Sequence, residues 1–233
     1  MKLTKVTITG ADDKVNPGVL ASLASEYPFV EWGILVSKKR EGSPRYPSHQ
    51  WIGQLIHQKM FHRQIQIAAH LCGEWAREAT DGPFTWAIVR NQQFKNFDRI
   101  QLNGLSENPF AVYAVDSLSE KLDKEFIFQA PKGFAFNHKS ISGMSKMSLL
   151  VDSSGGRGIP ITEITTPPYG LYVGYAGGIS HEKVEEIAQR VIAVPVDAET
   201  WIDCESGVRT NDEFDLDKVV SLLEKVKPLV STS

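Results

Sequence analysis

The 233-residue sequence predicts an α/β fold in which eight parallel strands alternate with helices and close into a (β/α)8 barrel. Short apolar segments rich in β-branched and aromatic residues alternate with helical patterns along the whole chain. Several of these segments also end at glycine-bearing turns, as in Ile8-Thr9-Gly10 and Ala176-Gly177-Gly178. In such a barrel, the loops after the strands meet on one face and form the ligand site.

The predicted strands are short, and several lack hydrophobic alternation, as expected for strands that are covered on both faces. In chain order they are Lys5–Gly10, Val30–Ser37, Gln64–Cys72, Arg99–Leu105, Glu125–Ala130, Met147–Asp152, Leu171–Ala176 and Thr200–Cys204. A doubly wound sheet would show the same alternation with helices. Glycine-rich loops after both of the last two strands favour the barrel, because barrels often bind phosphate there.

Between the strands, apolar residues recur at helical spacing in three clear stripes. They are Trp51-Leu55-Ile56-Met60, Val184-Ile187-Ala188-Val191 and Leu216-Val219-Val220-Leu223-Val226. Ser180 is the predicted N-cap of the second helix, and Pro228 ends the third. Asn108-Pro109 predicts a further helix start. The segments 131–146 and 159–170 carry weaker patterns, which predict short or missing helices.

Composition and charge exclude several classes of protein. Hydrophobic residues make up 42% and charged residues 23%, which is ordinary for a globular protein with a sizeable core. The net charge of −3 provides no overall attraction to nucleic acid or to an anionic membrane. The two cysteines do not suggest a disulfide framework, and no apolar run approaches the ~18 residues of a membrane span. We therefore expect one domain over residues 1–233, located in the cytoplasm, that acts as a monomer or homodimer without nucleic-acid or membrane partners.

Two glycine loops predict a phosphate site. They are Gly177-Gly178-Ile179-Ser180, which opens a helix predicted to contain residues 182–192, and Glu205-Ser206-Gly207-Val208. Adjacent glycines let backbone N–H groups approach a phosphate closely, and a helix N-terminus adds partial positive charge. The predicted phosphate-binding residues are therefore Gly177, Gly178, Ser206 and Gly207. The alternative is that each loop is a plain tight turn.

Asp152 ends the sixth predicted strand, directly before a loop that contains Gly156 and Gly158. A carboxylate at the C-terminal end of a barrel strand is placed for catalysis and can act as a general acid or base. The glycines of the loop are predicted to contact the phosphate. The alternative for Asp152 is that it caps its own turn.

Arg45 follows the second predicted strand, within Ser43-Pro44-Arg45-Tyr46. The planar guanidinium can donate two parallel hydrogen bonds to a carboxylate, and Pro44 stiffens the approach to it. The neighbouring cations at positions 38–40 are expected to be solvated. A second cluster, His70, Cys72 and Glu74, lacks a further ligand group at recognisable spacing, so no metal site is expected there.

Taken in this order, the motifs resemble the phosphoribosylanthranilate isomerase family, barrel enzymes of tryptophan biosynthesis. The resemblance spans nearly the whole chain and implies an Amadori rearrangement of an aminoaldose to an aminoketose, without a cofactor. It further implies that Arg45 binds a substrate carboxylate, that Asp152 is the general acid and that the two glycine loops hold the ribose phosphate. Asn103 and Asp203, at the ends of the fourth and eighth strands, are assigned with Arg45 to substrate binding.

The sequence departs from this family at the catalytic base. The family's Lys-Ile-Cys-Gly reads Thr7-Ile8-Thr9-Gly10, so Thr9 occupies the position of the catalytic cysteine. An alcohol does not titrate near neutral pH and cannot serve as this base unaided. The family's Gln-Leu-His-Gly reads Gln101-Leu102-Asn103-Gly104, which removes an imidazole. A replacement base could come from other residues near the strand ends: Asp12, Asp13, Cys72, Cys204 or Glu205.

The leading hypothesis is an isomerase-like enzyme that acts on a phosphorylated sugar, with Asp152 as general acid. The alternative is a catalytically inactive barrel that binds or sequesters a phosphorylated metabolite. A third possibility is an interaction scaffold that binds no small ligand. Replacing Asp152 by asparagine should abolish turnover in the first case and change affinity only modestly in the second.

Overall fold

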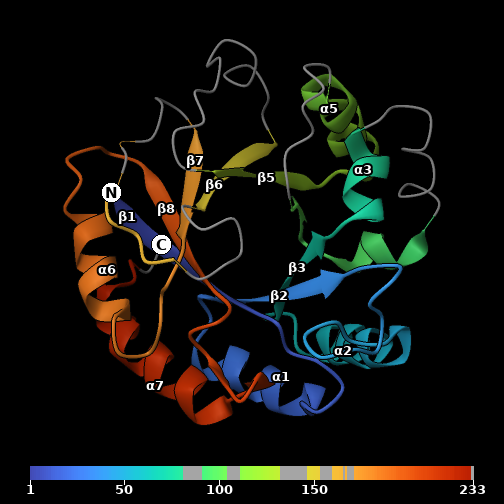
Figure 1. The fold of residues 1–233 in the computed structure, drawn as a ribbon, viewed down its shortest axis with the longest axis horizontal. Helices are drawn as coiled ribbons and strands as arrows, with labels where there is room; N and C mark the ends of the chain where they lie inside the picture. The colour runs from blue at the N-terminus through green and yellow to red at the C-terminus, as the bar shows by residue number, and fades with distance from the viewer. Residues whose placement is uncertain are drawn as a thin grey trace.

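The fold is a closed eight-stranded barrel in which each strand pairs in parallel with the next, and β8 pairs with β1 (Figure 1). The structure is a computed structural model, and it describes residues 1–80, 91–103, 111–131, 146–152, 159–164, 166 and 171–231. The barrel strands are β1 (Lys2–Thr9), β2 (Val30–Val36), β3 (Gln66–Leu71), β4 (Arg99–Leu102), β5 (Glu125–Pro131), β6 (Met147–Asp152), β7 (Tyr172–Ala176) and β8 (Glu199–Cys204). The predicted (β/α)8 fold class is thus confirmed.

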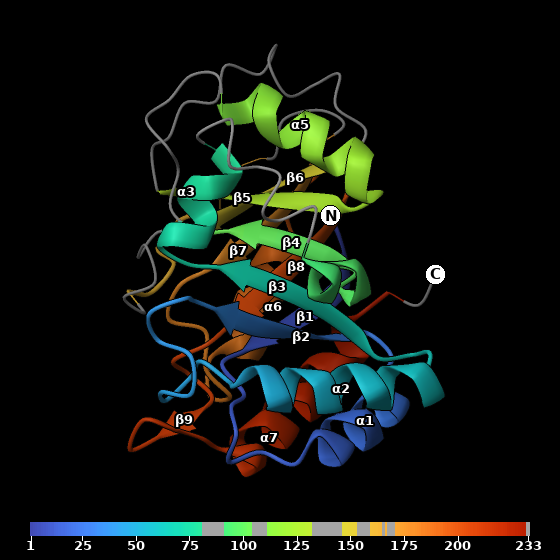
Figure 2. The ribbon, with the colours of Figure 1, turned by 90° about the vertical axis from the view of Figure 1, so that its right-hand side faces the viewer.

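Helices surround the barrel and cover its outer surface. They are α1 (Pro17–Glu26), α2 (His49–Phe61), α3 (Glu74–Thr80), α5 (Ala111–Leu122), α6 (Val184–Ile192) and α7 (Leu216–Val226), with 3-10 turns η1 (Gln92–Asn96) and η3 (Lys227–Leu229). Figure 2 shows α1, α2 and α7 on one side of the strands and α5 on the other. A small hairpin of β9 (Arg209–Thr210) and β10 (Glu213–Phe214) follows β8. No helix in the described part of the chain is both long enough and apolar enough to cross a bilayer.

Local sequence explains where the helices begin. The side chains of Asn16, Ser48 and Asp215 accept hydrogen bonds from the first turns of α1, α2 and α7, which satisfies N–H groups that have no partner within the helix. The predicted stop before Pro228 is also confirmed, because α7 ends at Val226. The predicted helix start at Asn108-Pro109 lies outside the described residues.

Three predicted boundaries are wrong. The strand predicted from Lys5 begins at Lys2, because the ladder between β1 and β8 continues to the pair Lys2 and Glu199. The strand predicted as Arg99–Leu105 ends at Leu102, and the other predicted strand ends agree with the structure within two residues. Ser180 is not the N-cap of α6: its backbone carbonyl accepts hydrogen bonds from Lys183 and Val184, forming a turn, and the helix begins only at Val184.

The apolar core has two parts. The larger part lies between the strands and the helices and includes residues such as Ile8, Leu20 and Val219. The smaller part lies inside the barrel and consists of Ile127, Leu150, Ala176 and Trp201, with Tyr172 packed against it. Much of the remaining interior of the barrel is polar, and the polar residues are arranged differently at its two ends.

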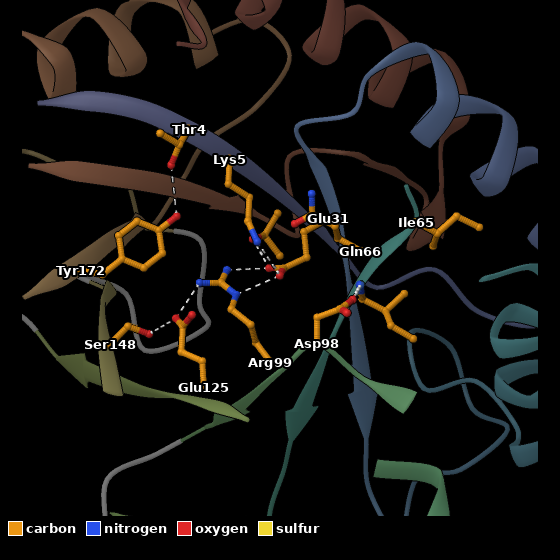
Figure 3. Close-up of polar contacts among 12 residues, drawn as sticks. Thr4, Lys5, Glu31, Ile65, Gln66, Asp98, Arg99, Glu125, Ser148 and Tyr172 are labelled. Carbon is orange, nitrogen blue, oxygen red and sulfur yellow. Dashed lines mark hydrogen bonds and ion pairs between the residues drawn. The ribbon is translucent and has the colours of Figure 1, made fainter. Parts of the chain in front are cut away.

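At the N-terminal ends of the strands, an ion-pair network fills the barrel (Figure 3). The Arg99 guanidinium donates to both carboxylate oxygens of Glu31, at 2.9 and 2.6 Å, and to Glu125 at 3.1 Å. Lys5 and Thr7 also donate to Glu31, at 3.4 and 2.9 Å. Burial by itself would raise the pKa of Glu31, but Arg99 and Lys5 hold it at about 2. Glu31 is therefore an ionised, fully paired group in the barrel interior.

Candidate functional site

A cavity lies at the C-terminal ends of the strands, on the face where barrel loops converge. The described residues that line it are His70, Gln101, Asn103, Gln129, Leu150, Asp152, Ala176, Gly177, Gly178, Ile179, Asp203, Glu205, Ser206 and Gly207. It therefore brings together seven of the residues predicted from sequence, from β6, β8 and the loops after β4, β7 and β8: Asn103, Asp152, Gly177, Gly178, Asp203, Ser206 and Gly207.

The loops after β7 and β8 lie side by side and form one wall. Ser180 and Gly207 form an isolated parallel bridge between them. A β-carbon on Gly207 would lie 1.9 Å from the carbonyl oxygen of Ile179, so only glycine allows this approach. Gly177 and Gly178 both have positive φ, at 122° and 60°, which favours glycine. After Gly207 the chain enters the β9–β10 hairpin rather than a helix. We refer to Gly177, Gly178, Ser206 and Gly207 as the glycine cradle.

Asp152 ends β6 and is 3% exposed. The side-chain amide of Gln129, from β5, donates to its Oδ2 at 2.7 Å. This contact fixes one carboxylate oxygen on the β5 side. The predicted glycine contacts at Gly156 and Gly158 lie outside the described residues.

Asp203, near the end of β8, lies on the same face, and its hydrogen-bond partner is Thr9. The Thr9 hydroxyl donates to Asp203 Oδ1 at 2.9 Å, and both side chains are buried. Burial raises the pKa of Asp203 to about 8, against the opposing effect of the Thr9 hydrogen bond. Thr9 itself is not among the residues that line the cavity. Thr9 is therefore joined to the cavity through its hydrogen bond to Asp203.

One part of the cavity lining, which we call the floor, consists of His70, Gln101 and Asn103 and is polar and uncharged. Gln101 Nε2 donates to Asn103 Oδ1 at 2.9 Å and contacts His70 Nδ1 at 3.3 Å. Asn103 Nδ2 in turn donates to Cys72 Sγ at 3.2 Å. Burial lowers the pKa of His70 to about 4, so the imidazole is neutral at physiological pH.

Arg45 lies at the rim rather than in the lining. Its Nη1 donates to Glu205 Oε1 at 2.8 Å, and its Nε donates to Asp212 Oδ1 at 2.8 Å. Its backbone has a φ of 73°, and its N–H donates to Asp12 at 2.9 Å. Two carboxylates of the chain thus occupy the guanidinium that was assigned to a substrate carboxylate.

The residues considered as replacement bases are mostly engaged elsewhere. Asp12 and Asp13 accept hydrogen bonds from the backbone of Arg45 and Ser48, and Cys204 is buried, which raises the pKa of its thiol well above the usual value. Cys72 is also outside the lining. Glu205 does line the cavity, but it is paired with Arg45.

The carboxyl side chains that line the cavity give it an acidic character. No lysine or arginine occurs among the described lining residues, whereas Asp152, Asp203 and Glu205 do. Two of these carboxyl groups are neutralised, because Asp203 holds its proton at pH 7 and Glu205 is paired with Arg45. Within the part of the chain that the structure describes, no three His, Cys, Asp or Glu side chains are grouped so as to hold a metal ion.

Sequence reasoning gave no role in the site to His70, Gln101 or Gln129. A signal for them existed in the period of two along the strands, because alternate residues of a strand face the barrel interior. Arg99 and Gln101 on β4, and Asn103 directly after it, follow this spacing. The polar residues at alternate positions could therefore have been assigned to the barrel lumen.

No family model matches the sequence of this chain, and no curated protein matches it either. Solved structures do match it. Monomers of the dimeric phosphoribosylanthranilate isomerase from Thermotoga maritima give a TM-score of 0.60 at 16% identity, over 97% of this chain and 100% of that chain. The 3-hexulose-6-phosphate synthase from Salmonella typhimurium gives 0.59 at 12% identity, over 97% and 99%. The 3-keto-L-gulonate-6-phosphate decarboxylase from Vibrio cholerae gives 0.57 at 13% identity, over 99% and 100%.

These likenesses show the barrel fold. The phosphoribosylanthranilate isomerase indicated by the motifs is among the similar structures. Barrels named for a synthase and a decarboxylase are similar to nearly the same degree, so the comparison does not select that family. The assignment to a reaction therefore depends on the side chains of the site.

Proposed function

We propose that this protein is an enzyme that isomerises a phosphorylated sugar by proton transfer between Asp152, Asp203 and the substrate. The observation that carries the proposal is the convergence of two buried carboxyl groups and the glycine cradle on one cavity. The similar structures from three organisms are all named for a phosphorylated or phosphoribosyl compound. That agreement supports a phosphorylated substrate.

The glycine cradle is the proposed phosphate site. With no cationic side chain among the described lining residues, the phosphate would be held by backbone N–H groups of Gly177, Gly178, Ser206 and Gly207. The neutral form of Asp203 and the pairing of Glu205 with Arg45 reduce the repulsion that an anion would meet. Both features favour binding of an anion in an otherwise acidic cavity.

Asp203 is the proposed base that replaces the missing cysteine. A general base works best when its pKa lies near the operating pH, and the buried Asp203 titrates at about 8. Its ionised form is stabilised by the Thr9 hydroxyl, which donates to it at 2.9 Å. In this proposal Thr9 serves the reaction through Asp203 rather than by taking the proton itself.

The proposed steps balance as an Amadori-type rearrangement. Asp152 gives a proton to the ring oxygen as the bond between that oxygen and C1 breaks, and the nitrogen lone pair forms a Schiff base at C1. Asp203 removes the proton from C2, which gives an enolamine. Asp203 then returns a proton to C1, and the C2 hydroxyl gives its proton to Asp152 as the ketone forms. Both carboxyl groups end in their starting states.

A second function, binding without turnover, is favoured by one observation. Thr9 stands where the phosphoribosylanthranilate isomerase family has its catalytic cysteine, so the titratable group of that family is missing. The Thr9 hydroxyl already donates a hydrogen bond to Asp203. In that case the cradle would hold a phosphorylated metabolite that the protein sequesters.

The test combines binding with proton exchange. Inorganic phosphate is titrated calorimetrically into wild type and Asp152→Asn, and both are incubated in D2O with phosphoribosylanthranilate and with ribose 5-phosphate. The enzyme proposal predicts deuterium uptake that Asp152→Asn abolishes, with phosphate affinity changed less than about threefold. The rate should rise with pH until Asp203 is ionised, near pH 8, because its carboxylate is the active form. Phosphate binding without exchange would favour the binding function, and the absence of phosphate binding would exclude both.

A further inference from the structure

The floor of the cavity contains two buried polar atoms that have no hydrogen-bond partner among the described residues. They are Nε2 of His70 and Oε1 of Gln101. The side chains belong to residues that are 2% and 3% exposed, and both line the cavity. Buried polar groups are normally hydrogen-bonded, so two unpaired ones in one cavity indicate a ligand that pairs with them.

The hydrogen-bond chain of the floor determines what these atoms offer. The Gln101 amide nitrogen faces both Asn103 Oδ1 and His70 Nδ1, so Nδ1 is an acceptor. In a neutral imidazole the proton then lies on Nε2, which becomes a donor. The Gln101 amide nitrogen is committed to the two acceptors, which leaves Oε1 as a free acceptor. The floor therefore presents one uncharged donor and one uncharged acceptor.

Gly33 on β2 leaves the space that the Nε2 edge of the imidazole occupies. A β-carbon at this position would lie 3.0 Å from His70 Nε2 and 2.1 Å from Thr9 Oγ1. Any other residue at position 33 would therefore press against both groups. The absence of a side chain there leaves room for His70 beside the Thr9 and Asp203 pair, so the floor and the proposed base belong to one site.

We infer that the floor binds the hydroxyl groups of a phosphorylated polyhydroxy chain, with His70 Nε2 donating and Gln101 Oε1 accepting. A hydroxyl group can both donate and accept, whereas a carboxylate or phosphate oxygen would satisfy only the donor and an aromatic ring neither. This inference rests on the proposed function, because it takes the glycine cradle as the phosphate end of the same ligand. It defines the substrate class as a sugar-like phosphate that presents its hydroxyl groups to the floor.

The test compares two phosphate esters of equal carbon number that cannot isomerise. Ribitol 5-phosphate carries four hydroxyl groups, and pentyl phosphate carries none. Both are titrated calorimetrically into wild type, with inorganic phosphate as the probe for the cradle alone. We expect wild type to bind ribitol 5-phosphate at least about tenfold more tightly than pentyl phosphate, because a site built for hydroxyl groups rejects an analogue that lacks them.

The variant His70→Phe removes Nε2 together with Nδ1, and Gln101→Leu removes Oε1 together with Nε2. Each should lower the affinity for ribitol 5-phosphate at least about fivefold and leave that for pentyl phosphate within about twofold. The unchanged pentyl phosphate affinity shows that the variant is folded, and Gln101→Leu carries the test if His70→Phe does not fold. Gln66→Leu, the same substitution at the start of β3 and away from the cavity, is the matched control and should alter neither affinity.

The outcomes separate the two proposals. Equal binding of the two esters by wild type overturns the hydroxyl floor while the phosphate cradle stands. A preference for ribitol 5-phosphate that survives both substitutions overturns the assignment to His70 and Gln101. No binding of either ester or of inorganic phosphate overturns the proposed function itself.

Discussion

The two ends of the barrel interior contain similar polar side chains, but these have opposite effects on stability. At the N-terminal end, Glu31 is ionised, with Arg99, Lys5 and Thr7 all donating to it. At the C-terminal end, Thr9 is the one hydrogen-bond donor to Asp203 among the described residues, and burial raises the pKa of Asp203 to about 8. Glu31 therefore stabilises the fold in its charged form, whereas Asp203 destabilises it when charged.

The difference in pairing between the two ends indicates which end of the barrel can bind a ligand. Buried polar groups that satisfy one another stabilise a structure, and groups left partly unsatisfied reduce its stability but remain available for binding and catalysis. The unpaired atoms of His70 and Gln101 lie at the same end as Asp203. Three experiments test this contrast, beginning with the largest expected effect.

Replacing Asp203 by asparagine should remove function and increase stability. The rate of proton exchange should fall about 10²–10⁴-fold, the usual contribution of a general base. The folded-state pKa of Asp203 is raised above the ordinary 3.8, so its stabilising contribution is complete below about pH 3.8 and is lost as the pH rises through 8. The variant should therefore be more stable than wild type at neutral pH, by about 1–2 kcal/mol, with a gap that widens from pH 5 to pH 8.5.

The measurement is urea denaturation at the two pH values together with the exchange assay. Asp197→Asn, which changes an exposed carboxylate, is the control and should alter neither quantity. A variant that is less stable than wild type at pH 8.5 would show that ionised Asp203 is not a destabilising group.

Replacing Arg99 by methionine should have the opposite outcome at the other end. The free energy of unfolding should fall by about 3–5 kcal/mol at pH 7, because Glu31 would lose its main partner while remaining buried. Phosphate affinity should change little, since none of these residues lines the cavity. Urea denaturation measures the first quantity and calorimetry the second.

The dependence on pH identifies the cause of this loss. In wild type the pKa of Glu31 is about 2, below the ordinary 4.5, so its contribution is present above pH 4.5 and is lost as the pH falls through 2. In Arg99→Met, Glu31 keeps only Lys5 and Thr7 as partners and protonates at a higher pH, so the difference from wild type should shrink at pH 3. A difference that stays constant would point to lost packing against Trp201 instead, since the guanidinium lies 4.6 Å from that ring. Lys2→Met, which breaks an exposed ion pair, should leave the midpoint almost unchanged.

Replacing Gly33 by alanine tests the close packing of Thr9 and His70 against β2 and has the smallest expected effect. The added β-carbon would press on Thr9 and His70, which should lower stability by about 1–3 kcal/mol and weaken binding of ribitol 5-phosphate. Gly53→Ala, on α2, adds the same methyl group where no atom lies within 4 Å. It should raise stability by up to about 1 kcal/mol, because alanine favours a helix. Thermal denaturation and calorimetry compare the two, and equal effects would contradict the proposed crowding at Gly33.

The barrel could be predicted because its signals are local. Each signal is contained in a few consecutive residues. Examples are the continuous apolar run Leu149-Leu150-Val151 and the glycine turns after β7 and β8. Asp152 could also be predicted, because it directly ends a strand. The start of β1 could not, since its first pairs form with β8 at the far end of the chain.

The chemical details of the site depend on contacts that sequence does not display. Thr9 and Asp203 are 194 residues apart and meet only because β1 and β8 pair. Arg45 forms ion pairs with Glu205 and Asp212, which belong to the loop and hairpin after β8. The pairing of Arg45 therefore depends on loop geometry. His70 looked like one member of a poor metal cluster, and only its unpaired nitrogen in the cavity distinguishes it from an ordinary core residue.

The pairing of β1 with β8 also has a consequence for folding. Seven of the strand pairs in the barrel join neighbours in the sequence, whereas this pair joins the two ends of the chain. Pairs between neighbours can form one after another, but a contact between distant segments carries the entropic cost of closing a long loop. The hydrogen bond between Thr9 and Asp203 spans that closing junction. The titration of Asp203 would therefore report on ring closure during refolding, since an incompletely closed chain leaves this carboxyl group hydrated and with an ordinary pKa.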